Sequence, residues 1–345
     1  MKPRLSILIP CYNVERYIGG CLDSIYRIKL SRDEFEVLCF DDKSTDNTPN
    51  TLDKYASTYS NLIVVHSLAN VGPGGGRNHL LSIAKGQYVW FVDGDDLIIS
   101  DAVLSILEKA ERNEADVITF NYKEWDNNEN DITHAYSQPD LEVGKGCEMV
   151  DKIYEGGLVN DMGYPVRFII RRDYLLRQNI LFPENMRFGE DTVWMAKVVL
   201  YAAKMMSSSE YGYVYWHHEE STCGMLNRIY PGRTIYEKCI LTSIQLIDFV
   251  NEIRIIGENQ KEAILLTHAD NIEKCTQNHY VNNLPIMLCR STKQERRVFY
   301  NYFSLEKESE KLRKYANSLT KTILLNSVGP FISDMLSYIY KIKHR

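Results

Sequence analysis

The chain has 345 residues, of which 44% are apolar and 25% charged. This composition supports a full hydrophobic core and argues against disorder, and the length is typical of about two domains. Its net charge of −6 is uneven, because residues 231–345 carry 17 Lys and Arg against 12 Asp and Glu, whereas residues 1–230 carry 23 against 34. We therefore expect two parts with different roles and no nucleic-acid partner.

Neither cysteine spacing nor hydropathy indicates a special class of protein. The eight cysteines are scattered without a C-x-x-C pair, which argues against a zinc knuckle or a redox motif. The first apolar run breaks at Pro10, too early for a secretory signal, and no uninterrupted apolar window is long enough to cross a membrane. The sequence predicts a cytoplasmic protein.

The first 120 residues alternate short apolar runs with helical stretches. The pattern predicts strands over 4–10, 36–42, 62–67, 87–93 and 115–121. The helices expected between them cover 14–29, 46–59, 75–85 and 101–113. Such alternation predicts an α/β fold with parallel strands, whose ligands bind at the carboxyl ends of the strands.

The rest of the chain divides into three stretches. Residues 121–140 lose the periodicity, which predicts a loop. From residue 144 to residue 216 the pattern is mixed, and from residue 232 helical spacing dominates. We expect an α/β domain over 1–225 and a helical region over 226–345.

The stretch "YVWFVDGDDL" runs from a buried strand directly into Asp93, Asp95 and Asp96. Carboxylates so close together repel one another, and a hard divalent cation such as Mg²⁺ or Mn²⁺ relieves that repulsion. The alternative is a solvated acidic turn in which Asp96 or Ser100 caps the next helix. The stretch alone leaves both interpretations open.

The segment "NVGPGGGRN" at 70–78 is rich in glycine. It matches neither the dinucleotide motif G-x-G-x-x-G nor a P-loop. A helix start with exposed N–H groups, together with Arg77, can hold a pyrophosphate. The alternative is that the glycines only permit close packing of a loop.

Two acidic pairs stand at positions suited to ligand binding. Asp41 and Asp42 follow the second strand, where a carboxylate can accept hydrogen bonds from a base or a ribose. Glu190 and Asp191, in "FGED", precede a helix. That second pair can equally be explained as a complement to the helix dipole.

Five motifs in this order, "LSILIPCYN", "VLCFDDKSTDNT", "NVGPGGGRN", "AKGQYVWFVDGDD" and "FGED", resemble the family 2 glycosyltransferases of GT-A fold. The resemblance covers residues 4–220. It implies an α/β fold with a Rossmann-like, mostly parallel central sheet flanked by helices, followed here by a helical C-terminal region.

The resemblance also implies roles for individual residues. In the family, the backbone after the first strand holds the nucleoside of a sugar nucleotide, which here means Pro10, Tyr12 and Asn13. The acids at the end of the second strand, Asp41 and Asp42, hold it as well. The glycine-rich segment lies close to the nucleotide through Asn70, Gly72 and Arg77. Asp93 and Asp95 face the ribose and a divalent metal, Mn²⁺ or Mg²⁺, on the diphosphate.

The second acidic pair and a late histidine complete the expected site. Asp191 matches the catalytic base of the family, and Glu190 lies beside it. In "YVYWHHEE", His217 is the candidate for a diphosphate or metal contact, and the alternative is a pair of histidines facing solvent at a strand end. The chain departs from the family pattern at Lys43, where glycine is common, and at Gly76, where alanine is common.

The helical region ends in "PFISDMLSYIYKIKHR", which combines apolar and aromatic residues with a basic cluster. Such a segment can lie in a membrane interface or form a last helix packed on its own domain. Both interpretations stay open. A peripheral location on the cytoplasmic face of a membrane would place the site near a lipid-linked acceptor.

These observations favour an inverting, metal-dependent glycosyltransferase that uses a nucleoside-diphosphate sugar, with UDP-sugars preferred, and a saccharide or lipid-linked saccharide acceptor. The expected pathway is bacterial cell-surface polysaccharide synthesis. A sugar-phosphate nucleotidyltransferase is a rival, but it requires a basic glycine-rich loop where "PCYNVERY" stands. A non-catalytic sugar-nucleotide-binding protein is another, against which the presence of both acidic groups argues.

Overall fold

The computed structural model describes residues 2–126, 131–153, 164–184, 186, 189–218, 235–281, 284–305, 312, 316, 317, 320, 330 and 333–337. The chain divides into two compact units. The first contains Met1–Arg187 and Trp194–His218, and the second contains Phe188–Val193 and Glu219–Arg345. The expected boundary between residues 225 and 226 falls outside the described residues and stays a prediction.

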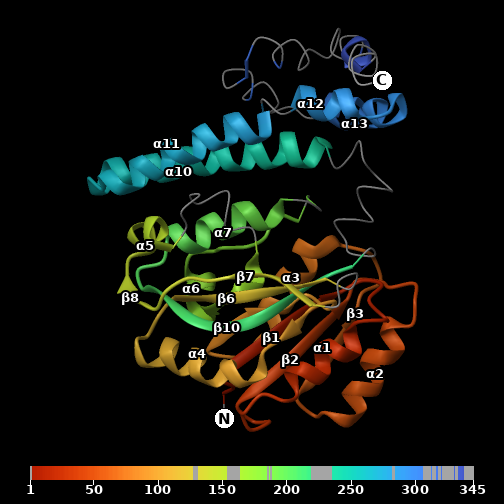
Figure 1. Cartoon of the computed structure of the whole chain (residues 1–345), viewed down its shortest axis with the longest axis vertical. Coiled ribbons are helices and arrows are strands. Elements are labelled where there is room, and N and C mark those ends of the chain that lie inside the picture. The colour runs from red at the N-terminus through yellow and green to blue at the C-terminus, as the bar shows by residue number, and fades with distance from the viewer. Residues whose placement is uncertain are drawn as a thin grey trace. The chain divides into compact units, whose positions relative to one another are not determined.

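The first unit is built on one mixed β-sheet (Figure 1). Its strands are β1 Leu5–Cys11, β2 Phe35–Asp41, β3 Leu62–His66, β4 Tyr88–Phe91, β5 Leu97–Ile98, β6 Val117–Asp126, β7 Asp131–Tyr136, β8 Leu141–Gly144, β9 Phe168–Arg171 and β10 Met205–His217. The main order is β3-β2-β1-β4-β9-β6-β10-β5, with β7 paired to β6 and β8 to β10. Strands β3, β2, β1 and β4 are parallel, and β9 runs antiparallel to β4 and β6.

Helices cover both faces of this sheet. They are α1 Ile18–Ile25, α2 Thr48–Thr58, α3 Gly72–Ile83, α4 Ser100–Arg112, α5 Gly146–Ile153, α6 Arg172–Arg177 and α7 Glu190–Leu200, with a 3₁₀ turn at Pro165–Arg167. Alternate β1 residues such as Ile7 and Ile9 enter a core shared with α1 and α4. On the other face, Phe91 of β4 meets the Trp194 ring of α7 with centroids 5.3 Å apart.

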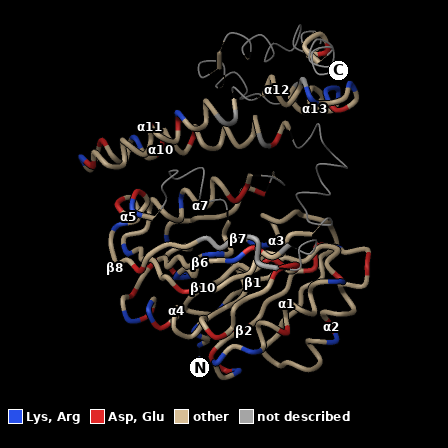
Figure 2. The backbone as a smooth tube through the Cα atoms, viewed as in Figure 1, with Lys and Arg blue, Asp and Glu red and all other residues tan. Residues whose placement is uncertain are grey.

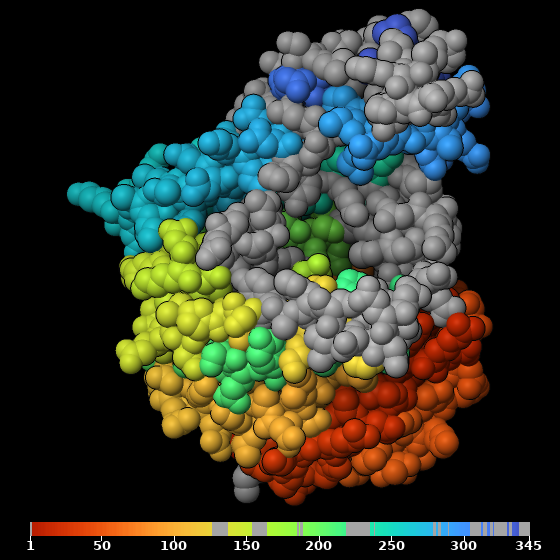
Figure 3. Space-filling model, viewed as in Figure 1, coloured from red at the N-terminus to blue at the C-terminus, as the bar shows by residue number. Residues whose placement is uncertain are grey.

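The space-filling view shows α1, α2 and α4 forming one outer surface of the first unit (Figure 3). All five strands and four helices expected over the first 120 residues are present, with ends displaced by a few residues. This agreement confirms the α/β class and the flanking helices.

The expected loop over 121–140 is wrong for 121–126 and 131–136, which are strands, while 127–130 lie outside the described residues. Strand β6 continues to Asp126, and its antiparallel pairing with β7 joins Tyr122 to Tyr136. The polar sequence is compatible with a strand because the buried Asn121 amide donates to the Ser209 carbonyl at 2.7 Å and accepts the Gln138 N–H at 2.7 Å. Polar side chains that are satisfied inside a sheet conceal the apolar alternation on which the prediction depends.

Charged residues of the first unit pair across elements, and Figure 2 shows basic and acidic positions side by side on α4. Lys109 of α4 lies 3.0 Å from both Asp140 and Glu210. Such solvent-facing pairs contribute about 0–1 kcal/mol each. The stability of the unit therefore depends mainly on its core and on buried hydrogen bonds.

The second unit is helical, as predicted. Its described helices are α10 Thr242–Gln260, α11 Ala263–Cys275, α12 Leu284–Arg290 and α13 Lys293–Leu305, with π-helical turns at Glu237–Leu241 and Thr276–Val281. Buried Ile240, Ile244, Leu288 and Phe299 belong to its core. Within the part of the chain that the structure describes, no helix is long and apolar enough to span a membrane.

The predicted last helix lies mostly outside the described residues. Of it, 333–337 are helical. The choice between a membrane-interface segment and a packed terminal helix therefore stays open.

A buried polar cluster joins the starts of β1 and β2 to the turn before β4. Ser6 Oγ donates to Glu36 Oε1 at 2.6 Å and accepts the Gly86 N–H at 2.8 Å, while Glu36 also accepts the Lys85 N–H. Both side chains are almost fully buried. Each group in the cluster thus depends on its neighbours for a partner that water cannot supply.

Ser6→Ala should lower the free energy of unfolding by about 1–3 kcal/mol, because it removes a donor to Glu36 and an acceptor of the Gly86 N–H. Denaturant unfolding measures the change. Ser57→Ala is the matched control, since Ser57 is exposed and donates to the nearby Lys54 carbonyl. Equal losses in the two variants would contradict the assigned role of the cluster.

Candidate functional site

The polar loops identified in the sequence meet at one edge of the sheet. Strands β1, β2 and β4 are parallel, with Cys11 opposite Asp41 and Leu8 opposite Phe91. The loops that follow them carry Asn13, Asp42 and Asp93. The carboxyl edge of the sheet is therefore the candidate site, as the fold class predicts.

Asp96 is the most deeply buried carboxylate of this edge. It accepts hydrogen bonds from the Tyr213 hydroxyl at 2.6 Å and the Trp216 N–H at 2.7 Å, both on β10. Burial raises its pKa well above the ordinary value, and the charges of Asp95 and Asp93 add to the effect. Asp96 thus ties the acidic turn to β10.

The alternative of an acidic turn that caps the next helix is wrong. Helix α4 begins at Ser100, its N-cap position is Ile99, and no side chain caps it. Asp96 instead bonds to β10, and Ser100 Oγ donates to the Ser24 carbonyl at 2.6 Å. The turn is acidic for a reason other than helix capping.

Arg77 of α3 pairs with Asp93, with Nη2 3.0 Å from Oδ1. The guanidinium is largely buried and lies over the Phe182 ring at 5.3 Å. Enclosure by the protein raises the pKa of Asp93, against the influence of Arg77, and the Asp95 charge raises it further. The structure thus joins two of the predicted residues, from the glycine-rich segment and the acidic turn.

Asp95 is bound by His218, not by His217. His218 Nε2 lies 3.0 Å from Asp95 Oδ2, whereas His217 Nε2 lies 3.1 Å from Glu124. The His218 side chain is only 4% exposed and stacks on the Tyr17 ring at 4.1 Å, and its buried Nδ1 has no hydrogen-bond partner among the described residues. The structure thus places His218, which the sequence did not single out, at the acidic turn, and the predicted contact of His217 with a diphosphate or a metal stays a prediction.

The signal that identifies His218 is its place one residue past the end of β10. Strand residues have fixed, alternating directions, and His217 is the last of them. The next residue is free to turn toward the sheet edge. The direction of the His218 side chain therefore depends on β10 ending at His217.

Asp42 has a structural partner at the start of α3. Its carboxylate accepts the N–H groups of Val71 at 2.7 Å and Gly72 at 2.9 Å, and Asn70 donates from its side chain to the Asp42 carbonyl. Gly72 has φ +80°, a conformation that favours glycine. Contact of Asp42, Asn70 and Gly72 with a nucleoside stays a prediction.

Two other glycines of this segment allow close packing. A Cβ at Gly74 would lie 2.7 Å from the Pro183 carbonyl oxygen, and one at Gly76 would lie 3.1 Å from the Phe40 ring. The same ring neighbours Pro10 across the strands, since Phe40 pairs with it. Close packing thus accounts for Gly74 and Gly76, including the absence of alanine at residue 76.

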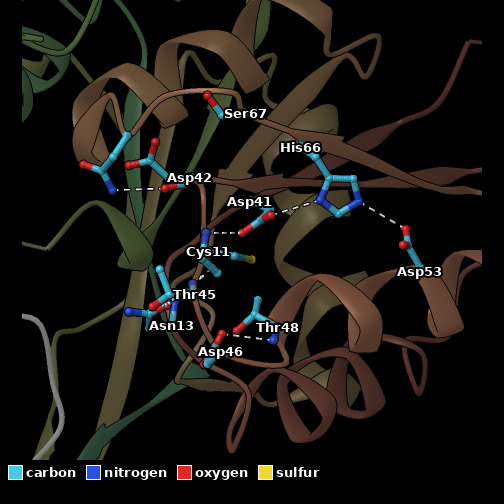
Figure 4. A network of polar contacts seen from close by, with 12 residues as sticks. Cys11, Asn13, Asp41, Asp42, Thr45, Asp46, Thr48, Asp53, His66 and Ser67 are labelled. Carbon is cyan, nitrogen blue, oxygen red and sulfur yellow. Dashed lines mark hydrogen bonds and ion pairs between the residues drawn. The ribbon is translucent and has the colours of Figure 1, made fainter.

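The loops after β1 and β2 are joined by hydrogen bonds (Figure 4). Ser44 Oγ accepts the Asn13 N–H at 3.0 Å, and Asn13 Oδ1 accepts the Thr45 N–H at 2.8 Å. Asn13 and Lys43 have φ of +54° and +62°, in the left-handed region that asparagine tolerates and lysine rarely adopts. Tyr12 and Lys43 remain exposed beside this network.

Glu190 and Asp191 form the first turn of α7. Glu190 is buried, and Asp191 Oδ1 accepts the Thr192 N–H at 2.8 Å. From Trp194 onward the helix belongs to the first unit, whereas Phe188–Val193 belongs to the second. The participation of Glu190 and Asp191 in the same site as Asp93 stays a prediction.

No cluster of three or more His, Cys, Asp or Glu side chains arranged to hold a metal occurs among the residues that the structure describes. Asp93 and Asp95 lie at the edge of the sheet as predicted, and His218 joins them. Their service as metal ligands also stays a prediction.

Comparison with known proteins agrees with this geometry. The chain is 34% identical over 214 residues to a poly(ribitol-phosphate) beta-glucosyltransferase of Bacillus spizizenii, covering 61% of this chain and 32% of the relative. It is 30% identical over 224 residues to the uncharacterized glycosyltransferase EpsJ of Bacillus subtilis, covering 64% of this chain and 63% of that protein. The alignments span less than two thirds of both relatives.

Solved structures share the fold. Staphylococcus aureus TarS 1–349 in complex with UDP-GlcNAc has a TM-score of 0.66 and 22% identity, covering 99% of this chain and 92% of that chain. The mannosyltransferase PcManGT of Pyrobaculum calidifontis, in complex with GDP-Man and Mn²⁺, has a TM-score of 0.50 and 16% identity, covering 98% and 88%. At these identities the similarity concerns the fold.

The family described as glycosyl transferase family 2 matches residues 6–181, just over half of the chain. That range contains β1, β2, the glycine-rich start of α3 and the acidic turn of Asp93, Asp95 and Asp96. The chain belongs to glycosyltransferase family 2.

Proposed function

We propose that this protein transfers a sugar from a nucleoside-diphosphate donor to an acceptor hydroxyl, with inversion at the transferred carbon and with the help of a divalent metal. The observation that carries the proposal is the group of carboxylates at the carboxyl edge of the sheet, where Asp93 and Asp96 have raised pKa values. A site with this excess of buried negative charge is suited to a cation and a diphosphate together.

The residues at this edge fit a divalent metal. Asp93 and Asp95 offer carboxylate oxygens, and the part of the chain that the structure describes supplies no hydrogen-bond partner for the buried Nδ1 of His218. Oxygen and imidazole ligands suit Mn²⁺, and oxygen ligands suit Mg²⁺. Bound there, the metal would act as a Lewis acid that neutralises the charge developing on the diphosphate leaving group.

Side chains of the protein would bind the diphosphate and the nucleoside and would take the proton of the acceptor. Arg77, held against Asp93, supplies a cation for the diphosphate. The loops that carry Tyr12, Asn13 and Asp42 bind the nucleoside. Asp191 acts as the general base that takes the proton of the acceptor hydroxyl, which would make a single displacement and hence an inverted product.

We propose a UDP-sugar as the donor, because the fold neighbour TarS is known in complexes with UDP and UDP-GlcNAc. The acceptor would be a hydroxyl of a cell-surface saccharide or polymer, since relatives are named for poly(ribitol-phosphate) substrates. Incubation with nucleotide sugars and Mn²⁺, with release of nucleoside diphosphate as the measurement, tests the proposal. A nucleotidyltransferase would release pyrophosphate instead, and a binding protein would release neither.

A cytoplasmic location, with peripheral contact to the membrane through residues 331–345, belongs to the same proposal. A few basic and aromatic residues can hold a segment reversibly at an anionic surface. A lipid-linked acceptor would then be within reach of the site.

Asp95→Ala should reduce turnover by at least about a hundredfold, because it removes both a proposed metal ligand and the charge that attracts the metal. It should also abolish the Mn²⁺ dependence of donor binding measured by calorimetry. Asp101→Ala is the control, since Asp101 is exposed and pairs with Lys29. Near-normal turnover of the variant in the presence of EDTA would refute the metal assignment.

Asp191→Asn should lower turnover by at least about a hundredfold with little change in donor affinity, because the amide keeps the size of the carboxylate but cannot take a proton. Single-turnover rates and donor titration separate the two effects. Asp173→Asn, at an exposed position in the first turn of α6, is the matched control. If the variant loses donor affinity and keeps its rate, Asp191 belongs to the nucleotide site.

A further inference from the structure

His66 joins two carboxylates beside the nucleoside loops (Figure 4). It is the last residue of β3, directly opposite Asp41 on β2. Its Nδ1 lies 3.0 Å from Asp41 Oδ2, and its Nε2 lies 3.2 Å from Asp53 Oδ1 on α2. The ring therefore bridges the end of a central strand and the helix that follows it.

Both contacts can be hydrogen bonds only when the ring is an imidazolium. Ionised carboxylates accept hydrogen bonds, and neutral histidine has a single N–H, so it leaves one carboxylate facing a lone pair. The bond to Asp41 raises the pKa of His66, burial opposes the rise, and the bond to Asp53 adds to it. The charged groups that face the ring are Asp41 of β2 and Asp53 of α2.

The two carboxylates bracket the loop 42–47. Asp41 also accepts the Ser44 N–H through Oδ1 at 3.0 Å, and Ser44 in turn accepts the Asn13 N–H. Asp41 therefore contacts both His66 and the hydrogen-bond network between the loops after β1 and β2. That network holds Asn13 and Lys43 in left-handed backbone conformations, and the one at Lys43 is unfavourable, so it persists only where the surroundings fix it.

We propose that His66 is a positioning residue for the donor nucleoside: as an imidazolium it fastens Asp41 to Asp53 and holds loop 42–47 in the shape that binds the nucleoside, and it releases that loop when it loses its proton. This inference rests on the proposed function. Nothing in it requires His66 to touch the donor, since it acts through Asp41 and the Ser44 N–H.

The direction of the pH dependence follows from the raised pKa of His66. The stabilisation is fully present below the ordinary histidine value of about 6.5 and is lost as pH rises through the higher folded-state value. Donor affinity should therefore fall, and the loop should loosen, as the pH rises through that folded-state value. A carboxylate with a lowered pKa would give the opposite trend.

The first measurement is amide hydrogen exchange of residues 42–47 from about pH 6 to about pH 9, expressed as protection factors so that intrinsic exchange rates cancel. We expect protection in the wild-type protein to fall by about fivefold, as for the loss of one hydrogen bond. His66→Gln should show low protection at every pH. Asp53→Asn, which keeps the side-chain size but removes one charge, should move the transition to lower pH.

Asp33→Asn is the control for net charge, because Asp33 is exposed and precedes the start of β2, at the opposite end of the strand from Asp41. It should behave as the wild-type protein does. Protection that is independent of pH in the wild type, or identical in His66→Gln, overturns the proposal. Because Asp53→Asn alters an exposed side chain, it keeps the test decisive if His66→Gln folds poorly.

The second measurement is UDP affinity over the same pH range, given as the ratio of wild type to His66→Gln so that the titration of UDP cancels. The ratio should fall from about fivefold toward one as pH rises, and turnover at saturating donor should change little. A ratio of one at every pH overturns the role of His66 and leaves the proposed function intact. Absence of binding of any nucleoside diphosphate overturns the proposed function and this inference with it.

Discussion

Three carboxylates within four residues, at the end of a buried strand, are the constraint on which the rest of the site depends. Asp96 accepts hydrogen bonds from two groups of the protein itself, the Tyr213 hydroxyl and the Trp216 N–H. Asp93 has the buried Arg77 guanidinium, and Asp95 has His218. The partners come from α3 and from the end of β10 with the residue that follows it, so the acidic turn draws these two elements together at one edge of the sheet.

The glycine-rich start of α3 follows from this requirement. Arg77 reaches Asp93 only if α3 lies close to the sheet, and Gly76 lets it do so because a Cβ would press on Phe40. Asp42 then fixes the first turn of the helix through the Val71 and Gly72 N–H groups. The glycine-rich segment resembles a phosphate loop in composition, but packing explains most of its glycines. Its charged residue, Arg77, pairs with Asp93 of the acidic turn.

Much of the fold could be predicted because period and composition reveal buried parallel strands, and because the ends of such strands share an edge. The residues that could not be predicted act across the sheet. Asn121 is polar but buried, so the hairpin after it was missed. His218 and His66 owe their contacts to strand ends and register, and neither has a local sequence signal that distinguishes it from a solvent-facing histidine.

The two acidic ends of the site have different chemistry, although their sequences look alike. At the end formed by the loop after β2, Asp41 and Asp42 accept backbone N–H groups, and His66 lies between Asp41 and Asp53. At the end formed by the turn after β4, burial raises the pKa of Asp93 and Asp96, while Arg77 and Tyr213 act in the opposite direction, so negative charge there remains costly. The proposed divalent cation would lower that cost at the second end and would gain little at the first. The diphosphate of the proposed donor would add negative charge next to the proposed cation. The uncharged nucleobase would then face the hydrogen-bonded loops after β1 and β2. The proposed orientation of a nucleotide sugar in this site thus depends on which end carries carboxylates whose negative charge stays costly despite their internal partners.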